Sequence, residues 1–225
     1  YVDDVFSTYV YTGSRNTNGS GSADTINNGI DLSGEGGMIW LKGRDSQPYD
    51  YGNGIFDTVR GKTKNIQTQT DAVEATYPNA VSSFNSNGFT LNDGTYNWLD
   101  STYASWTFRK KAGFFTCLTY SGNGTQGRTV DHDLGCVPGC ILIKCTSHDE
   151  GWQVYHRGVS DTPQNSALKI NTTDGIFSSN SYWNNTAPTS TQFTLYNAGS
   201  SNDSGKSYVA YLFAGGEDQT TATAR

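Results

Sequence analysis

Short stretches of alternating or wholly apolar residues recur along the chain, and Gly, Asn, Asp or Pro bounds each of them. Apolar runs of this length, separated by turn-forming residues, are typical of strands in an all-β sandwich or barrel. The pattern shows no convincing amphipathic helix. We therefore predict an all-β fold, with strands within residues 5–13, 36–43, 84–93, 103–110, 114–122, 139–145, 151–158, 166–172, 192–199 and 207–216.

The same order of strand-like blocks occurs twice, at a spacing of about 100 residues. "FSTYVYTG" (Phe6–Gly13) matches "FTCLTYSG" (Phe115–Gly122), and "GGMIWLK" (36–42) matches "PGCILIK" (138–144). Chance similarity of strand sequences would not preserve this order. We predict two tandem related β-sandwich units of jelly-roll or concanavalin-like type. They are expected over residues 1–110 and 111–214, with residues 215–225 as a linker or tail. Whether the units share one core stays open.

Charge and hydropathy exclude two classes of function. The 225 residues carry a formal net charge of −6, and only 16% of them are charged. A nucleic-acid reader would usually present a basic face, so no nucleic-acid partner is predicted. No apolar run approaches the roughly 18 residues that span a bilayer, so no membrane insertion is predicted either.

Three of the four cysteines lie within "CVPGCILIKC" (Cys136–Cys145), which raises the question of a metal site or a disulfide. Cys140 aligns with Met38 of the first unit, which favours a buried strand residue. The spacing lacks the two close pairs of a structural zinc site, and Cys140 and Cys145 would point to opposite faces of a strand. We predict core cysteines, with a disulfide involving Cys136 and a metal site as alternatives.

The titratable residues give little sign of catalysis. The four Glu residues avoid the middle of predicted strands, and the Asp residues cluster at turns, where capping of the backbone is their usual role. No nucleophile-elbow pattern accompanies the three histidines. We predict no enzyme activity, no catalytic residue and no cofactor. Calcium is the alternative to "no cofactor", because residues 131–133 and 147–152 concentrate oxygen ligands in loops. Arg60 and Arg157 align between the units and are expected to bond carboxylates or turn carbonyls.

Two polar segments combine aromatic and amide side chains, and they are the strongest binding signal in the sequence. One contains Tyr96, Asn97 and Trp98, and the other contains Tyr182, Trp183 and Asn184. Aromatic faces that stack on sugar rings, with amides that hold hydroxyl groups, are typical of carbohydrate sites. The alternative is that these residues cover the ends of a sandwich or contact a neighbouring subunit.

Taken together, the motifs resemble a module of tailed-bacteriophage virion proteins, found especially in marine and cyanobacterial phages. The resemblance runs from Val5 to about Ala214 and includes "GRTVDHDLGCVPGCILIK", "WQVYHRG" and "YVAYLFA". It implies a lectin-like or concanavalin-like sandwich on the exterior of the virion, assembled in the host cytoplasm. It brings no catalytic site.

This resemblance sets the expected function and partners. We expect a non-enzymatic tail-fibre or appendage protein that contacts other virion proteins and host-surface glycans. Tail fibres are commonly homotrimers, so a homotrimer is expected. The alternatives are a capsid decoration protein and a secreted bacterial lectin or polysaccharide-acting enzyme.

Overall fold

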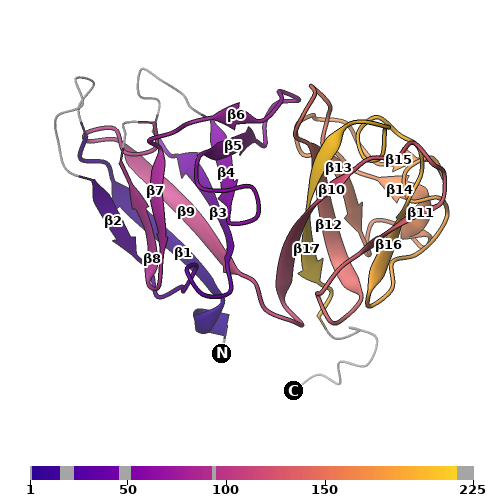
Figure 1. The fold of residues 1–225 in the computed structure, drawn as a ribbon, viewed down its shortest axis with the longest axis horizontal. Helices are drawn as coiled ribbons and strands as arrows, with labels where there is room; N and C mark the ends of the chain where they lie inside the picture. The colour runs from indigo at the N-terminus through magenta and orange to yellow at the C-terminus, as the bar shows by residue number, and fades with distance from the viewer. Residues whose placement is uncertain (1, 16–22, 46–51, 93–94, 217–225) are drawn as a thin grey trace. The chain divides into compact units, whose positions relative to one another are not determined.

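The computed structural model describes residues 2–15, 23–45, 52–92 and 95–216, and they form an all-β fold of antiparallel sheets (Figure 1). Of the expected tail 215–225, residues 217–225 lie outside the described part. No helix in the described part is long and apolar enough to cross a membrane.

The described chain divides into two compact units. Unit 1 contains the residues up to Lys110 together with 146–151, and unit 2 contains 111–145 together with the residues from Trp152 onward. Each unit has its own hydrophobic core.

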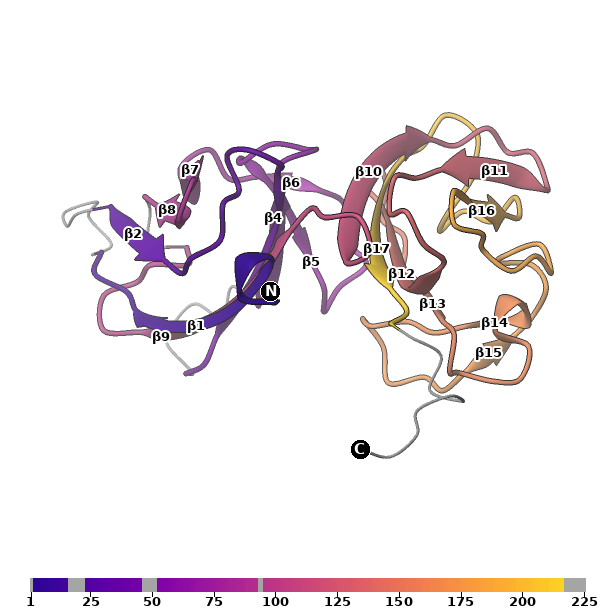
Figure 2. The same cartoon turned by 90° about the horizontal axis from the view of Figure 1, so that it is seen from below.

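Unit 1 consists of two sheets that enclose a core. The first sheet has the strand order β1-β9-β3-β4-β5-β6, and the second has the order β2-β8-β7. Figure 2 shows β2, β7 and β8 in a layer opposite β1 and β9. The strand bounds are β1 (Phe6–Thr12), β2 (Asp24–Asn27), β3 (Gly37–Gly43), β4 (Asn53–Asp57), β5 (Lys64–Gln67), β6 (Ala75–Thr76), β7 (Val81–Asn85), β8 (Gly88–Leu91) and β9 (Thr102–Arg109), preceded by the 3-10 turn η1 (Val2–Asp4).

Unit 2 has a four-stranded sheet, β10-β17-β12-β13, and two short ladders, β11-β16 and β14-β15. Its core lies between the four-stranded sheet and β11-β16, with Trp183 also part of it. The bounds are β10 (Phe115–Ser121), β11 (Arg128–Asp131), β12 (Pro138–Cys145), β13 (Gln153–His156), η2 (Pro163–Asn165), β14 (Ser166–Ala167), β15 (Phe177–Ser178), β16 (Gln192–Leu195) and β17 (Ser207–Ala214).

Four strands of the main sheet pair in the same order in the two units. β1-β9-β3-β4 in unit 1 corresponds to β10-β17-β12-β13 in unit 2, and β2-β8 corresponds to β11-β16. The registers also correspond: Phe6 pairs with Phe108 as Phe115 pairs with Phe213. The two units are therefore built on the same strand-pairing scheme.

Alternation along the central strands fills both cores. Ile39 and Leu41 of β3 belong to the unit 1 core, and Ile141, Ile143 and Cys145 of β12 belong to the unit 2 core. Full burial of an Ile or Leu side chain contributes about 1.5–3 kcal/mol. Successive side chains of a strand point to opposite faces of the sheet, so residues two positions apart lie on the same face, here the one that packs in the core.

The four cysteines are free thiols and all lie in the described part of the chain. Cys117 and Cys145 are buried, as expected of core residues, whereas Cys136 and Cys140 are half-buried. Burial raises the pKa of the Cys140 thiol to about 11, so this thiol stays protonated at neutral pH.

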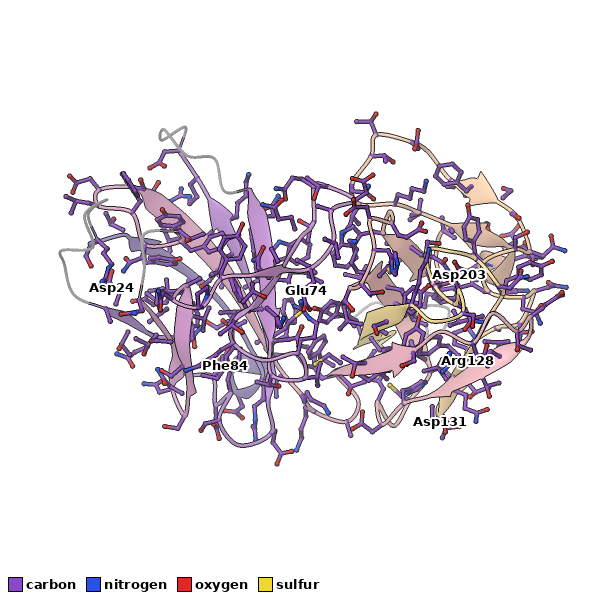
Figure 3. All side chains as sticks on the ribbon, turned by 45° about the horizontal axis from the view of Figure 1, so that its top comes forward. Asp24, Glu74, Phe84, Arg128, Asp131 and Asp203 are labelled. Carbon is purple, nitrogen blue, oxygen red and sulfur yellow. The ribbon has the colours of Figure 1, made fainter. Side chains whose placement is uncertain are left out.

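A buried ion-pair cluster follows β4 in unit 1. Arg60 Nε donates to Asp57 Oδ2 at 2.7 Å, and Arg60 Nη1 donates to Glu74 Oε2 at 3.0 Å. The Asp57 and Arg60 side chains are 0% and 3% exposed. Glu74, which is labelled in Figure 3, also meets the more exposed Lys64 at 3.3 Å. Arg60 therefore neutralises a carboxylate that has no access to water.

Arg60 and Arg157 both make contacts of the expected kind, but their positions in the fold differ. Arg157 is exposed, and its Nη1 reaches the Gly216 carbonyl at 3.4 Å. Met38 pairs with Asp57 and Cys140 pairs with His156, so Arg157 corresponds to Thr58 rather than to Arg60. The sequence alignment of the two arginines was wrong, because their short loops differ in length.

Replacing Arg60 with Met should destabilise unit 1 by about 3 kcal/mol, because the Asp57 carboxylate is left buried without its counter-charge. Urea unfolding followed by circular dichroism measures this loss. Lys64→Met is the control, since it removes an exposed partner of Glu74 and should cost about 1 kcal/mol or less. Equal losses in the two variants would contradict the role assigned to Arg60.

Candidate functional site

The fold buries half of the aromatic and amide residues that the sequence nominated for carbohydrate contact. Tyr96 is 1% exposed, Asn97 0% and Trp183 1%. These three side chains have no face available for a sugar, and the expectation of exposure is wrong for them. For these residues the packing alternative applies. Trp98, Tyr182 and Asn184 are half-buried.

In unit 1, Asn97 ties the loop before β9 to the end of β1. Its side-chain Oδ1 accepts a hydrogen bond from Ser14 N–H at 3.0 Å, and its carbonyl accepts one from Arg15 N–H at 2.9 Å. A side chain at Gly13 would collide with the Trp98 carbonyl, so the two chain segments approach closely. We call this arrangement the asparagine corner.

Unit 2 has the same corner, built on Asn202. Asn202 Oδ1 accepts from Asn123 N–H at 3.1 Å, and its carbonyl accepts from Gly124 N–H at 2.8 Å. A side chain at Gly122 would collide with the Asp203 carbonyl. One signal for this corner is visible in the sequence, because Gly13 and Gly122 end the first matched blocks. The Asn residues themselves lie in loops of dissimilar sequence.

A stacked tyrosine pair lies beside each corner. Tyr11 and Tyr103 stack at 5.1 Å between ring centroids, and Tyr120 and Tyr208 stack at 5.2 Å. Tyr11 Oη donates to the Tyr96 carbonyl at 2.8 Å, as Tyr120 Oη donates to the Ser201 carbonyl at 2.7 Å. Burial raises the pKa of Tyr208 to about 12, so its hydroxyl stays neutral.

The second nominated segment packs within unit 2. Trp183 Nε1 donates to the Ser166 carbonyl at 3.0 Å, and the indole makes an edge contact with Tyr155 at 5.5 Å. The backbone carbonyl of Tyr182 accepts from Tyr196 N–H at 3.1 Å. Asn184 has a positive φ of 50°, which is a conformation suited to Asn in a turn. Tyr96–Trp98 belongs to unit 1 and this segment to unit 2.

The Asp side chains of the acidic loops accept hydrogen bonds from other segments of their own unit. Asp131 Oδ1 accepts from Gln192 Nε2 at 2.6 Å, and Asp133 Oδ1 accepts from Thr116 Oγ1. Asp149 Oδ1 accepts from Val73 N–H at 2.7 Å. Among the described residues, no three His, Cys, Asp or Glu side chains are grouped as metal ligands.

A hollow of about 530 Å³ lies in unit 1, and we call it the unit 1 hollow. Sequence reasoning missed it, since its residues come from three separate segments. The volume is within the usual range for small-molecule sites. The hollow is lined by Leu32, Ser33, Gly34, Glu35, Gly36, Thr58, Lys62, Ser82, Ser83 and Phe84.

Unit 2 has a hollow of about 710 Å³ in the corresponding place, at the start of β12 and the end of β13. Its chemistry differs, since Arg157 and the half-buried Cys136 take part in the lining, with no carboxylate. The lining comprises Cys136, Val137, Pro138, Tyr155, Arg157, Gly158, Gly215 and Gly216.

The strand registers place the corner and the hollow at opposite ends of each unit. Gly43 of β3 pairs with Tyr103 at the corner end, and Gly37 pairs with Arg109 at the hollow end. In β12, Cys145 pairs with Tyr208 beside the corner, and Pro138 pairs with Ala214 beside the hollow. We take the hollow end of unit 1 as the candidate functional site, because it is open and lined by charged and hydroxyl side chains.

Asn202→Ala should destabilise the protein by about 2 kcal/mol or more. The substitution removes the hydrogen bonds that the buried Asn202 side chain makes with Asn123 N–H at 3.1 Å and the Thr125 carbonyl at 2.9 Å. Thermal and urea unfolding measure the loss. Asn197→Ala removes an exposed amide and should change stability by about 0.5 kcal/mol or less. An Asn202 variant as stable as this control would show that the corner is dispensable.

The comparisons with known proteins give a family but no activity. No curated protein matches the chain significantly, and no solved structure does. Residues 2–219, nearly the whole chain, match the family described as a domain of unknown function, DUF7483. Both units, with their corners and hollows, lie within this match. The chain belongs to the DUF7483 family.

Proposed function

We propose that the chain is a non-enzymatic structural protein of a tailed-bacteriophage virion, part of a tail fibre or similar appendage, which contacts host-surface glycans. The observation that supports this most is the use of one strand-pairing scheme in two successive units. Repetition of a β-module extends a protein without a new fold. Such construction suits an appendage on the exterior of a particle.

Two further features support the proposal. The motif set that resembles phage virion modules covers both units, from Val5 to about Ala214. The four free thiols suit assembly in a reducing host cytoplasm, where disulfides rarely persist.

Antibodies against the purified chain should label the tail appendages of intact phage particles whose genome encodes it. Immunogold electron microscopy measures this, with preimmune serum as the control. Gold on capsids that lack tails would instead assign the chain to capsid decoration. Particles that carry no label, while the infected-cell extract contains the chain, would overturn the virion role.

A homotrimer is part of the same proposal. Tyr9 and Val10 are 39% and 58% exposed on β1, an edge strand of its sheet. Exposed apolar residues on a sheet edge are suited to contact with another chain. Light scattering of the purified protein should therefore give three times the chain mass. A monodisperse monomer at high concentration would contradict this expectation.

A further inference from the structure

We infer that the unit 1 hollow is a binding site for a neutral saccharide, with Glu35, Lys62 and Ser83 as the groups that hold its hydroxyls. This inference rests on the proposed contact with glycans and gives it a place in the fold. It moves the sugar site away from the corner, where the buried Tyr96 and Asn97 lie. The hollow is at the other end of the same sheet.

Three polar groups in the hollow have bonding capacity left for a ligand. The Glu35 carboxylate is exposed, and neither it nor the Ser83 hydroxyl has a hydrogen-bond partner among the described residues. Lys62 Nζ donates one hydrogen bond, to the Ser82 carbonyl at 2.6 Å. An ammonium group has three donors, so two remain. Together these groups can accept from and donate to sugar hydroxyls.

The groups around them are already fixed by internal bonds. Asp31 Oδ1 accepts from Ser33 N–H, Ser33 Oγ and Gly34 N–H at 2.9–3.0 Å. The Gly34 backbone bond is the main cause that lowers the pKa of the Asp31 carboxyl. Thr58 Oγ1 accepts from Gly37 N–H at 3.0 Å. The loop that carries Glu35 is thus held in shape before a ligand arrives, which reduces the entropy cost of binding.

The exposed lining of the hollow is polar and apolar in about equal parts. Leu32 is 1% exposed and belongs to the core, whereas Phe84 on β7 is half-buried (Figure 3). One partly open ring offers a surface for the C–H face of a sugar. A peptide would instead need a deep apolar pocket for an anchoring side chain. The lining therefore favours a polyhydroxylated ligand over a peptide.

The charges in and around the hollow favour a neutral saccharide over an anionic one. Glu35 and Lys62 together contribute no net charge to the hollow, and the whole chain carries −6. An anionic sugar would face the Glu35 carboxylate and the overall negative field. A neutral saccharide meets no such repulsion, because its hydroxyls both donate and accept.

Heteronuclear NMR of the full chain, titrated with neutral trisaccharides of glucose, galactose, mannose and N-acetylglucosamine, tests the inference. With at least one of these probes, the amide resonances of residues 32–36 and 82–84 should shift and saturate. Sialyl and galacturonate trisaccharides and an unrelated peptide are titrated in parallel and should leave these resonances unchanged. Shifts confined to the unit 2 hollow or to Trp98, or stronger shifts with the acidic sugars or the peptide, would overturn the inference.

Substitutions then connect the binding to the named groups. Glu35→Gln and Lys62→Met should each weaken binding about tenfold, the loss of one charge-assisted hydrogen bond. Both residues are exposed, so the variants should fold normally. Asp174→Asn is the matched control, because it removes an exposed carboxylate from unit 2 and should leave the affinity unchanged.

The outcomes of this experiment and of the virion test are separable. If none of the neutral probes binds, the saccharide site is refuted, whereas gold on tail appendages would still support the structural role. If the probes bind the hollow and no particle is labelled, the chain is a saccharide-binding protein outside a virion.

Discussion

A buried asparagine that bridges two distant segments is the contact on which each unit depends. Asn97 and Asn202 are both 0% exposed, and each accepts a hydrogen bond from the backbone N–H of the second residue after the first strand, β1 or β10. These hydrogen bonds join residues that lie 83 and 79 positions apart. The side-chain oxygen of each Asn is buried, and leaving it without a partner would cost about 1–3 kcal/mol. The end of the first strand, β1 or β10, is therefore joined to the loop that precedes its pairing partner, β9 or β17.

The corner closes one end of each unit and leaves the opposite end as the place for a binding site. At the corner end, close backbone approach and stacked tyrosines leave little open surface. At the other end of unit 1, the loop before β3 and the loop after β4 leave a hollow beside β7. Glu35 and Ser83 keep their bonding capacity there. Each unit thus separates a closed, structural end from an open one.

The two units keep the same corner but differ in the hollow. The unit 1 hollow has Glu35 and Lys62, whereas the unit 2 hollow has Arg157 and Cys136. The shared strand pairing is compatible with this difference, because the residues that differ lie mostly in the loops. A shared scaffold can in this way carry two surfaces of different chemistry.

The sequence alone determined the all-β class and most of the strands, because alternation and turn residues act over short distances. "GMIWLKG" and "PGCILIKC" both form central strands, and Ile141 and Ile143 share the core face. It did not show which of the candidate site residues are buried. Tyr96, Asn97 and Trp183 look like surface residues in polar loops, yet hydrogen bonds and ring contacts from distant residues bury them. Only the tertiary structure decided which polar residues are buried and which segments form the hollow, since both depend on residues that meet through strand pairing rather than through nearness in the chain.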